Sequence, residues 1–198
     1  MTIVDSNYDF RYIDVRSVAN EGDSNILKAT KLDKQIYQQT LNLPQPEPLP
    51  NNPSGQPMPY VFLADEAFAM CKSIMRPYPA KKLTWQQRVY NYWLSRARRY
   101  VECGFGILAN KWRILHGPID VSIDVADIII QACCVLHNFV RHRDGYNFED
   151  TLSCPLESIP AIGKRDNIGV ETRNSFKNYF CSPAGSVSRQ NRSCNIVV

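Results

Sequence analysis

The stretch TWQQRVYNYWLSRARRYVECGFGILANKWRIL, residues 84–115, is long enough for several helical turns and contains no proline. Apolar and small residues recur along it at helical spacing, which predicts one long helix with a continuous apolar stripe. Thr84 is placed to cap its start. Its one acidic residue, Glu102, lies among five basic residues: Arg96, Arg98, Arg99, Lys111 and Arg113. A lone carboxylate in a basic helix is either a solvated ion-pair partner or a residue with a function of its own.

Two glycines, Gly104 and Gly106, follow Glu102 in the same predicted helix. Glycine costs a helix interior roughly 0.5–1 kcal/mol relative to alanine. We therefore expect close packing against a sheet to require both of them.

Basic residues are concentrated around this helix. Residues 67–118 contain ten Lys and Arg and one acid, a net charge of +9, which leaves −5 for the rest of a chain whose total is +4. A positive field of this kind favours polyanions such as nucleic acid. A solvated basic face is the alternative on charge alone.

The bulk composition describes an ordinary globular chain. Its 198 residues suit one domain plus tails, and 44% hydrophobic residues are enough for a core. We find no apolar run of the ~18 residues that a membrane span needs and no signal peptide, so we expect an intracellular protein with no membrane partner. Seven cysteines without a CxxC pair argue against disulfides and a zinc site, and predict reduced, mostly buried thiols.

The first 65 residues predict strands and a long loop. Residues 2–4 and 10–18 predict a hairpin closed by a turn at residues 5–9. Because its first arm is so short, we expect the fold to begin upstream and this chain to be truncated. Residues 44–59 hold seven of the thirteen prolines and predict an exposed loop. The apolar run at residues 60–64 predicts a strand buried on both faces, and it ends at Asp65, which is either a site residue or an N-cap.

The second half predicts another long helix from Ser122, its N-cap, to about residue 142. Apolar residues surround it almost completely, which indicates a core helix. His137 on this helix is better explained as a core histidine than as a metal ligand, since no second histidine or CxxC stands at ligand spacing. We expect a turn-rich stretch at residues 144–167, a short docking helix near 170–180, and a mobile tail after Cys181.

Asp65 and Glu102 together suggest a metal site. A carboxylate at a strand end and another on a helix can hold hard divalent cations, which prefer oxygen ligands. Two Mg²⁺ or Mn²⁺ ions about 3.5–4 Å apart can clamp a phosphodiester. Nearby Arg and Lys side chains would then bind the phosphates of the DNA backbone. Spacing alone is weak support, because many domains contain an Asp and a Glu this far apart.

Four blocks of sequence, in order, make this interpretation more specific. They are YVFLADEAF (60–68), MRPY (75–78), NYWLSRARRYVECGFGIL (91–108) and LHN (136–138). Together they resemble PIF/Harbinger-type DDE transposases and the harbinger transposase-derived nucleases. The resemblance runs from about Thr2 to Phe180.

The resemblance implies an α/β fold of the RNase H-like type, truncated at its N-terminus, in which long helices pack on a mixed sheet. It implies metal-dependent cleavage of DNA at transposon ends and strand transfer, with Mg²⁺ or Mn²⁺ as the cofactor. On that pattern Asp65 is the second catalytic acid and Glu102 the third, and Asp23 matches a further Asp of less certain role. Arg96, Arg98, Arg99, Lys111 and Arg113 are then expected to contact DNA.

One departure from the family pattern affects function. The first catalytic Asp of the family lies on a strand upstream of this chain, and Asp5 and Asp14 lie in the wrong strands to replace it. The helix-turn-helix module expected before the catalytic domain is also absent, so a separate helix-turn-helix or Myb-like protein is a candidate DNA-binding partner. We therefore expect a catalytically incomplete chain that is inactive alone.

The predicted organisation is a partial nuclease domain at residues 1–143 and a C-terminal extension at 144–198, in a protein of the nucleus. Two alternatives belong to other classes. One is a domesticated, non-catalytic module that binds DNA or protein and retains the basic helix. The other is a purely helical structural protein, which requires Asp65 and Glu102 to lie far apart.

Overall fold

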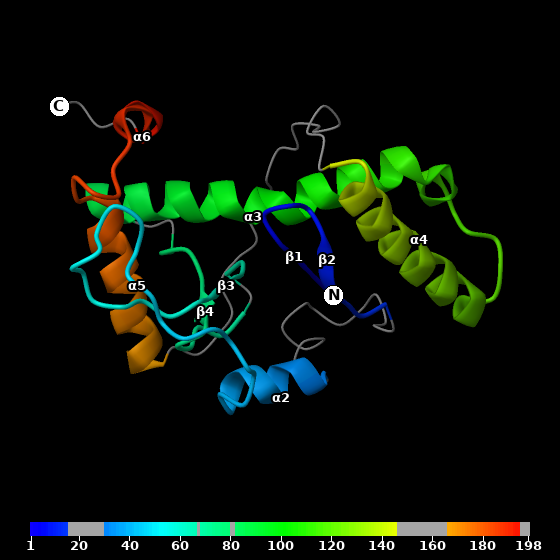
Figure 1. The fold of residues 1–198 in the computed structure, drawn as a ribbon, viewed down its shortest axis with the longest axis horizontal. Helices are drawn as coiled ribbons and strands as arrows, with labels where there is room; N and C mark the ends of the chain where they lie inside the picture. Colours follow the sequence, from blue (N-terminus) through cyan, green and yellow to red (C-terminus); the bar gives the residue numbers. More distant parts are fainter. Residues whose placement is uncertain (16–29, 67, 80–81, 146–165, 195–198) are drawn as a thin grey trace. The chain divides into compact units, whose positions relative to one another are not determined.

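The computed structural model describes residues 1–15, 30–66, 68–79, 82–145 and 166–194 (Figure 1). The chain forms two compact units, the first made of Met1–Glu21 with Arg98–Glu157 and the second of Gly22–Ala97 with Ser158–Val198. Asp23, one of the predicted site residues, lies outside the described residues. The elements, in chain order, are β1 (Thr2–Val4), β2 (Phe10–Ile13), α2 (Lys31–Tyr37), β3 (Phe62–Leu63), β4 (Ile74–Met75), α3 (Trp85–Lys111), the 3₁₀ helix η1 (Arg113–His116), α4 (Ile123–Arg143), α5 (Asn167–Phe180) and α6 (Ser188–Ser193).

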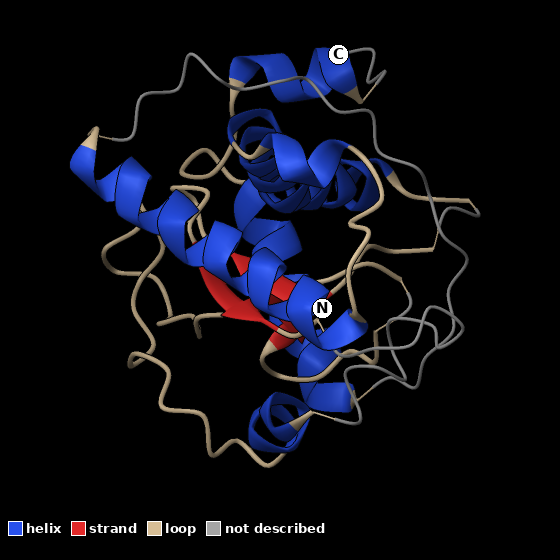
Figure 2. Cartoon of the chain, turned by 90° about the vertical axis from the view of Figure 1, so that its right-hand side faces the viewer, coloured by secondary structure: helices blue, strands red, loops and turns tan. Residues whose placement is uncertain are grey.

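Helices dominate the described chain, and its strands are short (Figure 2). In the described ranges the strands form two separate sheets of two strands each, β1–β2 and β3–β4. Helices combined with small sheets agree with the predicted α/β class. The long helix predicted over residues 84–115 is confirmed as α3, with η1 following it. α3 begins at a reciprocal cap, in which the Gln87 backbone N–H donates to Thr84 Oγ1 and the Thr84 N–H donates to Gln87 Oε1.

In the first unit, β1 and β2 form the predicted antiparallel hairpin, with Thr2 opposite Ile13 and Ile3 opposite Tyr12. β2 ends at Ile13, short of the predicted residue 18, and residues 16–18 lie outside the described residues. Asp5 builds its turn, because Asp5 Oδ1 accepts hydrogen bonds from the backbone N–H groups of Asn7 and Asp9. Tyr8 in this turn has a φ of 63°, a left-handed conformation that is uncommon for a residue with a side chain. Contacts from elsewhere in the unit must therefore hold it.

Helix α4 supplies those contacts. The ring nitrogen Nε2 of His137 lies 2.9 Å from the Tyr8 carbonyl oxygen, and Arg141 Nε donates to the Asn7 carbonyl at 2.8 Å. The Asn138 amide both accepts from the Phe10 N–H and donates to the Phe10 carbonyl, at 2.9 and 3.0 Å. Asn138 therefore pairs with β2 as a neighbouring strand would. The prediction that His137 is a core histidine is confirmed, since its side chain is buried and hydrogen bonded.

The core of the first unit lies between the hairpin, the C-terminal half of α3 and α4. Phe10, Leu108, Cys133 and Cys134 form its buried centre. Gly104 permits the close approach of the hairpin, because a Cβ there would lie 3.2 Å from Val4 Cγ1. The corresponding expectation for Gly106 is wrong, since a Cβ at Gly106 would meet no atom within 4 Å.

In the second unit, β3 and β4 are parallel, with Phe62 opposite Ile74 and Leu63 opposite Met75. The prediction that this strand is buried on both faces is wrong. The Leu63 side chain is 40% exposed, because in the described part of the chain the only strand partner of β3 is β4. The core of this unit lies on β4 and the start of α3, and its buried members are Met75, Tyr78, Tyr90 and Leu94.

The C-terminal segment belongs to the second unit and packs on it. Near residues 170–180, where a short helix is expected, the chain forms α5. The Arg173 guanidinium lies over the Tyr78 ring at 3.8 Å, and the Tyr78 hydroxyl donates to Asn174 Oδ1. Beyond Cys181 the chain is not simply a mobile tail, because α6 places Gln190 in a buried position where Oε1 accepts from Trp93 Nε1. All six described cysteines are free, as predicted.

Helix α4 differs from its prediction in three respects. Ser122 occupies the N-cap position, yet its side chain makes no capping hydrogen bond. The helix is not buried all round, since Ile128, Val135 and Phe139 are each more than 60% exposed. It also meets the length and composition criteria for a membrane span, with a mean hydropathy of 1.6, against the expectation that no such run exists.

Candidate active site

Glu102 lies on α3 in the part of the helix that belongs to the first unit. Its Oε2 atom is buried, and none of the residues that the structure describes hydrogen bonds to it. Burial raises the pKa of the Glu102 carboxyl above its ordinary value, and the neighbouring Arg98 and Arg99 lower it by less. One explanation of Glu102 from the sequence was a solvated ion-pair partner. It does not fit Oε2, because this atom is buried and accepts no hydrogen bond from the described residues. A buried carboxylate oxygen without a partner is costly to the fold and free to bind a ligand.

Asp65 follows β3 in the second unit. The Ala64 N–H donates to the Met75 carbonyl at 2.9 Å, so the pairing with β4 continues to the residue before Asp65. In the described chain no helix begins at Asp65, and the reciprocal cap of the next helix is at Thr84. A turn begins at Glu66 and residue 67 lies outside the described residues, so the alternative that Asp65 caps this turn stays open.

The loop after Asp65 is held by Arg76, a residue whose role the sequence alone did not reveal. Arg76 is 4% exposed, and its Nη1 donates to the carbonyls of Glu66 and Phe68 at 3.1 and 3.0 Å. Asn91 of α3 supports the same region by exchanging two hydrogen bonds with the Tyr78 backbone. The sequence did contain one signal for this role. In and before the MRPY block, the charged Arg76 directly follows the apolar pair Ile74 and Met75, which form β4.

The two predicted acids belong to different units, so each has surroundings of its own and their pairing stays a prediction. Among the described residues, no group of three or more His, Cys, Asp and Glu side chains could hold a metal ion. Oε2 of Glu102 is the kind of oxygen that a divalent cation binds, but the described residues assemble no complete set of ligands around it. The described geometry alone therefore supports no metal-dependent step.

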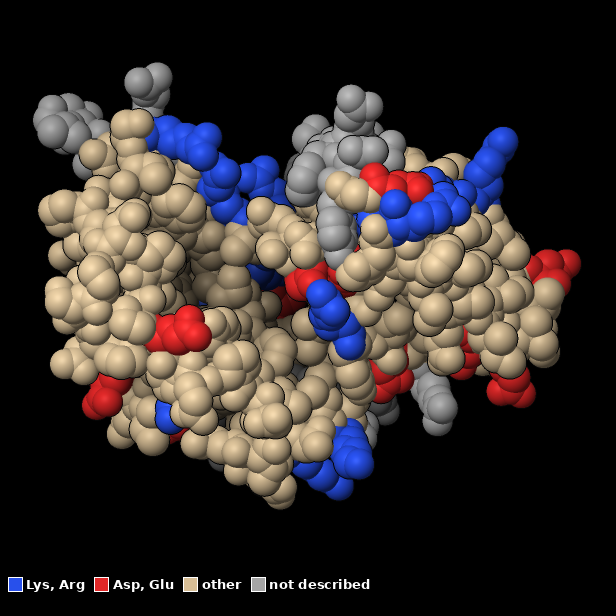
Figure 3. Space-filling model, in the orientation of Figure 1, with Lys and Arg blue, Asp and Glu red and all other residues tan. Residues whose placement is uncertain are grey.

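The predicted DNA-contacting residues divide by surroundings. Arg96 belongs to the second unit, where its guanidinium lies over the Tyr92 and Trp93 rings and its Nη1 donates to the Tyr92 hydroxyl. Arg98 is half-buried, whereas Arg99, Lys111 and Arg113 are exposed. Figure 3 shows basic side chains on the surface over α3. The exposed ones are available to a polyanion, while Arg96 already has partners.

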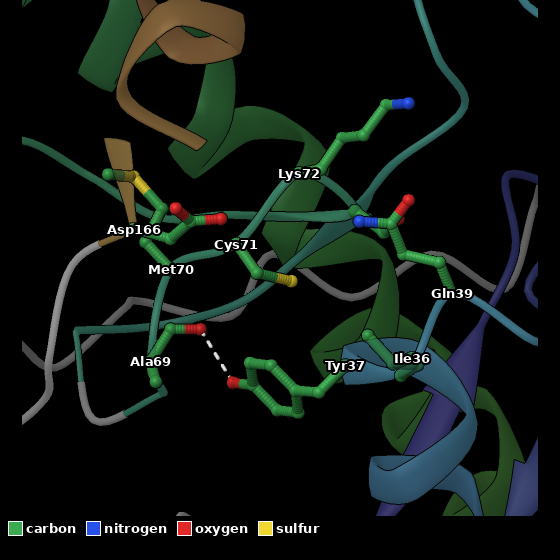
Figure 4. Close-up of a pocket in the computed structure, with 9 residues that line it drawn as sticks. Ile36, Tyr37, Gln39, Ala69, Met70, Cys71, Lys72 and Asp166 are labelled. Carbon is green, nitrogen blue, oxygen red and sulfur yellow. Dashed lines mark hydrogen bonds between the residues drawn. The ribbon is translucent and has the colours of Figure 1, made fainter. Parts of the chain in front are cut away.

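A cavity of about 300 Å³ opens in the second unit between α2 and the chain around Cys71 (Figure 4). The Tyr37 hydroxyl donates to the Ala69 carbonyl at its edge. Burial raises the pKa of the Cys71 thiol, which favours the protonated, unreactive form. Since neither Asp65 nor Glu102 lines it, this cavity is not the predicted site.

Comparison with protein families supplies the deciding observation. The family model described as DDE superfamily endonuclease matches residues 1–138, which is most of the 198-residue chain. The chain belongs to the DDE superfamily endonucleases. Comparison with curated proteins gave no match. Comparison with solved structures also gave none.

Membership in this DDE endonuclease family confirms the resemblance to DDE transposases and supports a nuclease or transposase-derived function. The matched range includes Asp65, Glu102, Arg76 and Asn138, so the contacts described above lie within the family domain. DDE superfamily endonucleases generally use divalent metals, and the nuclease family suggests DNA as the substrate.

Proposed function

We propose that this chain is a nuclease domain of the PIF/Harbinger type, with an RNase H-like fold, that hydrolyses phosphodiester bonds of DNA with Mg²⁺ or Mn²⁺. The observation that carries the proposal is the Oε2 atom of Glu102, which is buried, has no hydrogen-bond partner among the described residues and lies inside the matched family range. Keeping a carboxylate in such a position costs stability, which is typical of residues retained for function.

In this proposal Glu102 and Asp65 are metal ligands, and Asp23, a further Asp of less certain role, is an additional candidate ligand. The metal ions, when bound, would activate water and stabilise the leaving oxygen in a two-metal arrangement. Arg76 would hold the loop that carries Asp65, and Arg98 and Arg99 would moderate the cost of the Glu102 charge. The exposed side chains of Arg99, Lys111 and Arg113 would contact the DNA backbone, and Arg96 is a further candidate for such a contact.

We further propose that the polypeptide is catalytically incomplete by itself, since its sequence matches two of the three acids of the family motif. A separate helix-turn-helix or Myb-like protein would then supply DNA recognition, and both would act in the nucleus. The basic segment at residues 67–118 supports the DNA partner.

The test compares the full chain with Glu102→Gln in metal binding and DNA nicking. We expect Mn²⁺ to raise the unfolding temperature of the wild type and not of Glu102→Gln, with little nicking by either protein. Robust nicking that requires Mg²⁺ and Glu102 would overturn the incomplete-site proposal and keep the nuclease proposal. DNA binding that is salt-sensitive yet indifferent to metal and to Glu102 would favour a domesticated, non-catalytic binding module.

A further inference from the structure

The face of α4 that points away from the hairpin carries a row of exposed apolar side chains. Ile128 and Val135 are each 64% exposed, Phe139 is 61% exposed and Val125 44%. With Ala132, also exposed, they occupy positions 125, 128, 132, 135 and 139, spaced alternately by three and four residues. This is the spacing of a coiled-coil seam, whose side chains interlock with those of another helix.

The opposite face of α4 already has its partners. His137, Asn138 and Arg141 bond to the hairpin of the first unit, and Cys133 and Cys134 are buried in its core. Insertion of this helix into a bilayer would expose these polar groups to lipid or break their bonds, which is costly. Only the exposed face of α4, which carries the apolar row, is therefore open to a partner, and the spacing of the row suits another helix.

The two ends of α4 carry opposite charge. Asp120, Asp124 and Asp127 lie at its start, and Asp120 and Asp124 are exposed. Arg141 and Arg143 lie at its end, and Lys111 is close enough to influence both His137 and Asp144 electrostatically. Two described acids lie in that group: Asp144 bonds to Arg143 at 2.7 Å, and Asp9 lies 3.0 Å from His142. The three bases outnumber these two acids and leave this end net basic.

We propose that this face of α4 binds the same face of a second copy of the chain, with the two helices antiparallel. A two-fold axis at the level of Cys133 and Cys134 would set Ile128 beside Phe139 of the other copy. It would set Ala132 beside Val135 and bring Asp124 near Arg143. Each large side chain then meets a complementary one, and the acidic end of one helix meets the basic end of the other.

Self-complementarity is what favours a second copy over an unrelated partner. A two-fold interface uses one surface twice, so that surface must fit itself in both shape and charge. The row of α4 does so only when antiparallel, because a parallel pair would set three aspartates against three aspartates. Helix dipoles also oppose each other favourably in the antiparallel pair.

The experiment is sedimentation velocity of the full chain over a micromolar concentration series. We expect reversible self-association that Val135→Lys weakens by at least about tenfold, or about 1.4 kcal/mol. Ile123→Lys is the matched control, because Ile123 is 81% exposed but lies off the row. Phe139→Gln provides a second variant, and circular dichroism establishes that each variant keeps its helices.

A charge exchange tests the antiparallel arrangement itself. Asp124→Arg should weaken the association, and adding Arg143→Glu to it should restore the association, because both copies then carry complementary ends again. A wild type that stays monomeric, or equal effects of Ile123→Lys and Val135→Lys, would overturn the proposal. Binding of the monomer to anionic vesicles through Val135 would overturn it in favour of a membrane surface.

Discussion

Glu102 illustrates a carboxylate held at the expense of stability. Its pKa is raised by burial, so the folded state binds the proton more tightly than the unfolded state does. Between the ordinary pKa of about 4.3 and the raised value, the unfolded state loses its proton first. The fold therefore becomes less stable as pH rises through this window, and the loss persists at neutral pH.

We accordingly expect Glu102→Gln to raise stability at pH 7, by up to about 1 kcal/mol. The gain should shrink as pH falls towards 4, where the wild-type carboxyl is protonated. Urea unfolding across this pH range measures the effect. Glu171→Gln, at an exposed position on α5, is the control and should change little. A loss of stability at pH 7 in Glu102→Gln would contradict the argument.

Arg76 is a second residue whose substitution has a defined result. Arg76→Ala removes two hydrogen bonds and leaves the carbonyls of Glu66 and Phe68 without this donor, at a cost of about 1–3 kcal/mol. We expect Arg76→Ala to speed amide hydrogen exchange, relative to the wild type, more in residues 64–68 than in the rest of the second unit. Arg88→Ala, at an exposed position on α3, should leave this exchange unchanged. Equal protection in the two variants would show that the loop does not depend on Arg76.

At the scale of elements, the hairpin and α4 depend on each other. Asn138 is the link, since its amide bonds to both backbone groups of Phe10. We expect Asn138→Ala to destabilise the first unit by about 1–3 kcal/mol and to expose the hairpin amides to exchange. Gln131→Ala lies on the exposed face of the same helix and serves as the control. If the hairpin amides stay protected from hydrogen exchange in Asn138→Ala, the apolar core and not Asn138 stabilises the hairpin.

At the scale of the whole chain, the basic segment at residues 67–118 carries +9 in a chain whose total charge is +4. If the exposed Lys and Arg side chains of this segment bind DNA phosphates, replacing any one of them by a neutral residue should reduce the salt dependence of binding. We expect Arg99→Gln to lower the slope of log K against log salt by about 0.9 on duplex DNA. Lys31→Gln, at an exposed position on α2, should not alter the slope. An unchanged slope in Arg99→Gln would exclude that residue from the interface.

The sequence predicted those features that depend on neighbouring residues. The cap at Thr84, the length of α3 and the turn at Asp5 all arise from contacts within a few positions. It did not predict the role of Asn138 or the exposure of Leu63, because both depend on what the chain packs beside them. A run of apolar residues indicates burial without saying how many of its faces are covered. For this reason α4 was expected to be a core helix, although one of its faces is open. The motif resemblance proposes Asp65 and Glu102 as the family's acids, and only the fold shows what surrounds Glu102.

The bond between Asn138 and Phe10 joins positions 128 residues apart. During synthesis the ribosome adds about 5–20 residues per second, so the hairpin would wait roughly 6–26 s for the helix that holds it. Over that time the turn at Tyr8 lacks the contacts that maintain its left-handed backbone. The hairpin is therefore fixed only after Asn138 has been made, and a nascent chain stopped before Asn138 would leave the hairpin open to proteases and chaperones.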